Sequence, residues 1–153
     1  MGRTEVRVMT DPRGVFIALL VLVFAGLAPP SGGQTREARK VPVEGGGSYT
    51  DVSAGGLARM LARKEFPLVN VHIPYEGEIA GTDLFIPFDQ VEAKLAELPA
   101  DRSAKLVLYC RSGSMSATVA RALVRLGYTN VWNLDGGMIA WKQTGHPLVQ
   151  KGR

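Results

Sequence analysis

Short apolar runs alternate with amphipathic segments over most of the chain. Three runs rich in Val, Leu and Ile are bounded by prolines or polar residues, as buried strands are, at 67–73, 104–109 and 130–134. Apolar residues recur at helical spacing in 53–61, 89–98 and 114–126, and a turn leads into a shorter helix at 135–145. Because strands alternate with helices and the strands are unbroken apolar runs, the pattern predicts an α/β fold: an open parallel sheet flanked by helices on both faces.

Capping residues and helix breakers set the expected limits of these segments. Ser53 and Asp89 are placed to cap the first two helices, and Gly127 ends the third. Segment 74–88 contains prolines and glycines and follows no regular period, so we expect a long loop there. Loops of this length are often functional.

The N-terminal 28 residues have the layout of an export signal. Arg3, Arg7 and Arg13 precede an uncharged apolar run at 15–28, and small residues and prolines follow. A secretory signal peptide has an apolar region of about 7–15 residues, whereas a membrane-spanning helix needs about 20. We therefore expect 1–28 to be a signal peptide, or else an uncleaved N-terminal membrane anchor. The protein is then exported to the periplasm or another extracytoplasmic space.

The rest of the chain divides into a linker and one domain. Segment 29–47 is rich in Pro, Gly and charged residues and is expected to be a flexible linker, and 48–150 is expected to form a single domain. The net charge of the 153 residues is +4. Lys and Arg are scattered, with no interleaved aromatic residues, which argues against nucleic acid as a partner. A small anionic ligand fits this mildly basic balance better.

Cys110 is the only cysteine, and it follows directly after the apolar run 104–109. Ligand sites in open parallel sheets lie beyond the carboxyl ends of the strands, which is where Cys110 is expected. The small residues after it let backbone N–H groups converge at the start of the next helix, an arrangement that binds anions and stabilises a thiolate. Arg111 adds a cation that attracts an anionic substrate. We therefore interpret Cys110 as a reactive nucleophile rather than an inert buried cysteine.

The stretch "YCRSGSMSATVARALVRLGYTNVWNLDGGMIAWKQTG" resembles the rhodanese (thiosulfate sulfurtransferase) family in its single-domain form. The resemblance extends over about 53–149 and is more specific in its C-terminal half. It implies a rhodanese-like domain in which Cys110 takes the outer sulfur of thiosulfate or a similar donor as a persulfide and passes it to cyanide or a thiol. The active loop would comprise this cysteine and the substrate-binding residues Arg111, Ser112, Gly113, Ser114 and Met115. The resemblance implies no metal and no organic cofactor, and we expect a monomer.

Three features depart from the family pattern. Met115 occupies a position where many members have a basic residue, and Asn70 and His72 stand where the family has an Asp-x-Arg pattern. The usual Gly-His-Ile stretch is replaced by "GEIAGTDLFIPF". These departures leave a second function open: a non-catalytic rhodanese-like binding module that presents an anion-binding loop.

Other polar residues are weaker candidates. His72 ends the first predicted strand and could approach Cys110, but an ordinary strand-end histidine is the favoured interpretation. His146 adjoins a proline in a terminal turn and is interpreted as structural, and no spacing supports a metal site.

Two further kinds of chemistry are weaker hypotheses. The acidic residues Glu76, Glu78 and Asp83 could form a pair for acid–base work but are interpreted as solvated loop residues. A cysteine phosphatase is disfavoured because no arginine closes the loop across from Cys110 to clamp a phosphate.

Overall fold

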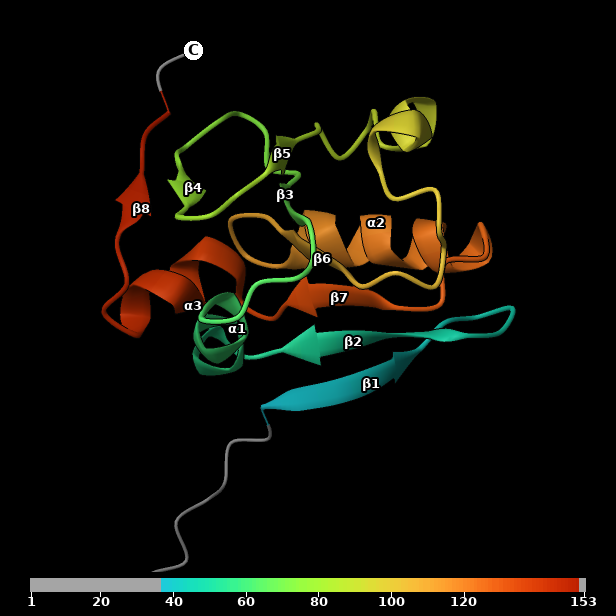
Figure 1. Cartoon of the computed structure of the whole chain (residues 1–153), viewed down its shortest axis with the longest axis horizontal. Coiled ribbons are helices and arrows are strands. Elements are labelled where there is room, and N and C mark those ends of the chain that lie inside the picture. Colours follow the sequence, from blue (N-terminus) through green and yellow to red (C-terminus); the bar gives the residue numbers. More distant parts are fainter. Residues whose placement is uncertain (1–36, 152–153) are drawn as a thin grey trace, which may run out of the picture. The chain divides into compact units, whose positions relative to one another are not determined.

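The computed structural model describes residues 37–151, whose main feature is one six-stranded sheet (Figure 1). The strand order is β1-β2-β7-β6-β3-β5, and neighbours are parallel except for the antiparallel pair β1 and β2. These strands are β1 (Ala38–Pro42), β2 (Ser48–Val52), β3 (Leu68–Asn70), β5 (Leu84–Phe85), β6 (Leu106–Tyr109) and β7 (Val131–Leu134). A second, antiparallel sheet pairs β4 (Glu78–Ile79) with β8 (Leu148–Val149).

Helices cover both faces of the main sheet. They are α1 (Ala54–Leu61), α2 (Ser114–Arg125) and α3 (Gly137–Gln143), with a 3₁₀ helix, η1 (Glu92–Glu97), before β6. Successive side chains of a strand point to opposite faces, and β6 divides in this way. Leu106 and Leu108 share one core cluster with residues of α2, whereas Val107 and Tyr109 share the other with residues of α1 and α3. The predicted α/β fold with helices on both faces is confirmed.

The predicted strands and helices are largely present. The three apolar runs form β3, β6 and β7, and the strongest helical patterns form α1 and α2. The Ser53 hydroxyl accepts the Gly56 N–H at 3.1 Å, which confirms it as the N-cap of α1. Gly127 follows α2 with a φ of +91°, a left-handed conformation that suits a residue just beyond a helix C-terminus.

The prediction of a flexible linker at 29–47 is wrong over its C-terminal part. Residues 38–42 form β1, which pairs with β2 along its length, and Val43 is only 5% exposed in the core. The glycines at 45–47 all have positive φ and turn the chain between the two strands. The ordered domain therefore includes β1. The predicted signal peptide or anchor at 1–28, and the first part of the linker, lie outside the described residues.

Two other segments differ from their predicted structure. Segment 89–98 forms the 3₁₀ helix η1 rather than an α-helix; Val91, not Asp89, precedes it, and Lys94 interrupts it with non-helical dihedrals. The predicted loop 74–88 contains the two-residue strands β4 and β5. Within 37–151, no helix is both long and apolar enough to cross a membrane.

Candidate active site

Cys110 lies directly beyond the carboxyl end of β6, as predicted, and the residue is only 1% exposed. Its Sγ accepts hydrogen bonds from two groups: the Gly113 N–H at 3.1 Å and the Ser116 hydroxyl at 3.5 Å. Ser116 is fully buried, and its hydroxyl also reaches the Gly113 carbonyl at 3.2 Å. Both donors stabilise negative charge on the sulfur, because hydrogen bonds to an ionised acceptor are stronger than those to a neutral one.

The loop after Cys110 turns directly into α2. Gly113 has a φ of +89°, which an L-residue rarely adopts, and the Ala117 N–H donates to its carbonyl at 3.0 Å. The N–H groups of the first residues of α2 therefore have no acceptor within the helix. They point out of its N-terminal end, which directly follows the Cys110 loop. The positive end of the α2 dipole adds to this field.

The structure divides the predicted substrate-binding residues into two groups. Arg111, Ser112 and Ser114 are exposed, whereas Gly113 is buried against the chain that follows β7. Met115 is half-buried and packs against the core cluster that contains Cys110. The loop thus presents polar side chains outward and an apolar one inward.

The start of α3 holds the other side of the loop. The Met138 N–H donates to the Cys110 carbonyl at 2.9 Å, and the Ile139 N–H donates to the Arg111 carbonyl at 3.0 Å. These bonds give the carbonyls of Cys110 and Arg111 their hydrogen-bond donors and join the loop to α3. Gly137 permits this approach, because a Cβ there would lie 2.7 Å from the carbonyl carbon and oxygen of Arg111.

Glu76 connects the loop to the segment after β3. Its Oε2 lies 3.4 Å from Arg111 Nε, and its Oε1 lies 3.5 Å from Nε2 of His72. The His72 side chain is 7% exposed, and neither ring nitrogen has a hydrogen-bond partner within the described residues. His72 is therefore buried beside a carboxylate that itself contacts the active loop.

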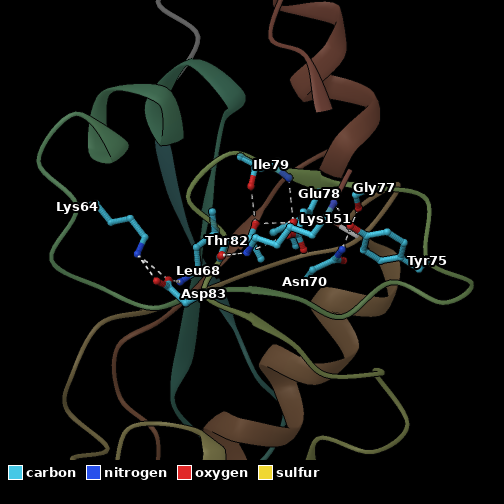
Figure 2. A network of polar contacts seen from close by, with 11 residues as sticks. Lys64, Leu68, Asn70, Tyr75, Gly77, Glu78, Ile79, Thr82, Asp83 and Lys151 are labelled. Atoms are coloured by element: carbon cyan, nitrogen blue, oxygen red, sulfur yellow. Dashed lines mark hydrogen bonds and ion pairs between the residues drawn. The ribbon is translucent and has the colours of Figure 1, made fainter. Parts of the chain in front are cut away.

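The other two acids of the predicted long loop have structural contacts. Asp83 accepts the Leu68 N–H at 2.7 Å and pairs with Lys64. Glu78 is 1% exposed, and its Oε1 lies 2.9 Å from Nζ of Lys151 (Figure 2). The interpretation of these acids as solvated loop residues is wrong for Glu78, since its carboxylate is buried and paired.

A hydrogen-bond network holds the end of β6, directly before Cys110. The Tyr109 hydroxyl accepts the Ile79 N–H at 3.0 Å and lies 2.7 Å from the Thr82 hydroxyl, while Lys151 Nζ donates to the Thr82 carbonyl at 2.7 Å. Burial raises the pKa of Tyr109 well above its usual value, so the phenol stays neutral. The C-terminal segment and β4 are thereby connected to the end of β6. Figure 2 shows Lys151 beside Glu78 and Thr82 in this network.

Sequence reasoning missed two residues that the structure places at this loop, Ser116 and Gly137, and it did not foresee the contact of Glu76 with Arg111. Ser116 follows the loop by one residue, and its place in the first turn of α2 is a signal that could have identified it. The roles of Glu76 and Gly137 depend on contacts across the sheet edge that no local pattern shows. His146 stacks on Trp141 with ring centroids 4.3 Å apart, the kind of packing contact expected of a structural histidine. In the part of the chain that the structure describes, no three His, Cys, Asp or Glu side chains converge as metal ligands.

Comparisons with known proteins agree with this geometry. A family model described as "Rhodanese-like domain" matches residues 55–144. A protein named "Sulfurtransferase" from Allochromatium vinosum is 36% identical over 103 residues, which cover 65% of this chain and 94% of that relative. The thiosulfate sulfurtransferase GlpE of Pseudomonas fluorescens is 42% identical over 45 residues, 29% of this chain and 41% of that protein. A crystal structure of a rhodanese-related protein from Thermoplasma volcanium superposes with a TM-score of 0.57 at 28% identity, covering 66% of this chain and 98% of that one.

Proposed function

The chain belongs to the rhodanese family, whose sulfurtransferase members it resembles, and we propose that it transfers sulfane sulfur through a persulfide on Cys110. The observation that carries this proposal is the position of the thiol. Its sulfur lies at the strand end, where it receives the Gly113 N–H and the Ser116 hydroxyl at 3.1 and 3.5 Å. Two donors directed at one sulfur stabilise the negative charge that it carries when it attacks the donor.

In the first step the Cys110 thiolate attacks the outer sulfur of the donor. A new S–S bond forms on Sγ, and the bond between the outer sulfur and the rest of the donor breaks. With thiosulfate the leaving group is sulfite, which departs with the bonding electron pair. The persulfide that remains carries the negative charge, and the amides at the start of α2 stabilise it.

In the second step a thiophilic acceptor attacks the outer sulfur of the persulfide. When the acceptor is cyanide, a carbon–sulfur bond forms and thiocyanate is released. When the acceptor is a thiolate, the product is a new persulfide. The S–S bond to Cys110 breaks, and its electron pair returns to Sγ as the thiolate. The two steps balance in atoms and electrons without a cofactor, and they give ping-pong kinetics.

We further propose that the protein acts outside the cytoplasm as a monomer. Support comes from the sequence of 1–28, which combines three arginines with an uncharged apolar run. A single cysteine also suits an exported catalyst, because it has no second thiol with which to form an internal disulfide. Fractionation of the native host, with the mass of the mature N-terminus, tests both export and signal cleavage.

A binding module remains the second candidate, because Cys110 is 1% exposed and Met115 replaces a basic residue of many relatives with an inward-packed apolar side chain. Steady-state assays of thiocyanate formation separate the two functions. The enzyme gives parallel double-reciprocal lines for donor and cyanide, and Cys110→Ser abolishes turnover. A folded domain that binds the anion but forms no thiocyanate with any sulfane donor supports the module instead.

A further inference from the structure

The active loop has an unusual charge balance for a site that receives an anion. Among its residues 110–115, Arg111 carries the only cationic side chain, since Met115 is apolar and packs against the core. In the described structure no lysine or arginine other than Arg111 pairs with Glu76. The field of the loop on a donor therefore depends on this one guanidinium, the backbone amides and the charges next to them.

Glu76 offsets that guanidinium. Its two carboxylate oxygens face opposite partners, with Arg111 Nε at 3.4 Å on one side and the buried ring of His72 at 3.5 Å on the other. The exposed fractions of the three side chains are 60% for Arg111, 41% for Glu76 and 7% for His72, so the carboxylate lies between an exposed cation and a buried ring. The Ile139 N–H donates to the Arg111 carbonyl at 3.0 Å and holds the backbone of that residue. A negative charge is thus in contact with a residue of the active loop.

Thiosulfate brings two negative charges to a thiolate that is itself negative. A neighbouring carboxylate repels this dianion about twice as strongly as it repels a donor with one charge, because the coulombic energy is proportional to the donor charge. We propose that Glu76 determines donor specificity: by offsetting Arg111, it favours sulfane donors with at most one negative charge, such as organic persulfides, over thiosulfate. This inference rests on the proposed sulfurtransferase function.

The favoured reaction has the same bond changes as the thiosulfate reaction. The Cys110 thiolate attacks the outer sulfur of R–S–SH, the Sγ–S bond forms, and the S–S bond of the donor breaks. The electron pair of that bond leaves with R–S⁻, and the transferred sulfur keeps its proton. The leaving thiolate carries one negative charge, whereas sulfite carries two. The carboxylate of Glu76 therefore repels the thiolate less than it repels sulfite.

The test compares two donors of matched shape that differ by one charge, thiosulfate and methanethiosulfonate. In Glu76→Gln we expect kcat/KM to rise about tenfold for thiosulfate and about threefold for methanethiosulfonate, since the energetic effect scales with donor charge. The ratio of the two values then moves about threefold, and added salt reduces the change. Glu97→Gln is the matched control, because that carboxylate pairs with Lys94 on η1, is 45% exposed and should leave both values unchanged.

Met115→Lys provides a second, independent variant. It adds a cation to the loop, so the ratio of kcat/KM for thiosulfate to that for methanethiosulfonate should rise, as in Glu76→Gln. This shift shows that the ratio responds to charge at the loop. A ratio that stays constant in folded Glu76→Gln but shifts in Met115→Lys, while the wild type turns over both donors, overturns the role of Glu76 alone. Absence of thiocyanate from either donor in a folded wild type overturns the proposed function, and this inference with it.

Discussion

Gly137→Ala tests whether the contact between α3 and the active loop is required. Gly137 has a φ of +55°, so alanine there costs about 1–2 kcal/mol in backbone strain. The added Cβ would also lie 2.7 Å from the carbonyl carbon and oxygen of Arg111, an overlap that costs a further 1–3 kcal/mol, roughly. We expect the free energy of unfolding to fall by about 2–5 kcal/mol.

Gly145→Ala is the matched control. It has a φ of +85° and nothing within 4 Å of its Cβ position, so it should lose only the strain of about 1–2 kcal/mol. Urea denaturation measures the loss of stability in each variant, and the difference between the two losses is the cost of the steric overlap at Gly137. Because the Gly137 variant displaces the carbonyls of Cys110 and Arg111, its rate of persulfide formation should fall on the order of 100-fold. Equal losses of stability in the two variants, or an unchanged rate in Gly137→Ala, would refute the reasoning.

Three further perturbations address the thiol, the C-terminal contact and a surface turn. Ser116→Ala removes a donor to Sγ and should slow persulfide formation about tenfold, while the exposed control Thr118→Ala leaves the rate unchanged in stopped-flow assays. Lys151→Met leaves the buried Glu78 carboxylate unpaired, and urea denaturation should show a loss of about 2 kcal/mol in the free energy of unfolding, because Lys151 itself is partly exposed. A double variant with Glu78→Gln that fails to recover this loss would contradict the account. Hydrogen bonds within its turn hold the pKa of Asp101 below 3.8, so its stabilisation is present above that pH and is lost as the pH falls through the lowered pKa. Unfolding curves of wild type and Asp101→Asn should therefore converge in acid, and a gap that widens there would contradict this sign.

The core of the fold and the place of the thiol could be predicted because both follow from local sequence pattern. The runs that form β3, β6 and β7 are continuous and apolar, and parallel strands buried on both faces require such runs. Once β6 is known, Cys110 must lie at its carboxyl end, and the small residues after it must lead into α2. This local order is what made the active loop recognisable.

The errors arose where tertiary contacts decide the structure. Residues of β1 such as Arg39 and Lys40 are exposed, so the segment has the polar composition of a linker, yet pairing with β2 orders it. Glu78 looks like a loop acid until β4 pairs with β8 and brings Lys151 to it. Glu76 likewise gains its significance only from the fold, which places it beside the loop residue Arg111. Such pairings join residues far apart in sequence and leave no periodic signal.

Mass spectrometry of the intact domain, after incubation with a sulfane donor, tests the central claim most directly. Thiosulfate, methanethiosulfonate and an organic persulfide are compared, each with and without cyanide, beside Cys110→Ser. The account predicts a gain of one sulfur atom on Cys110, its removal by cyanide, and no gain in the serine variant. A folded protein with a free thiol that acquires sulfur from none of these donors would contradict it.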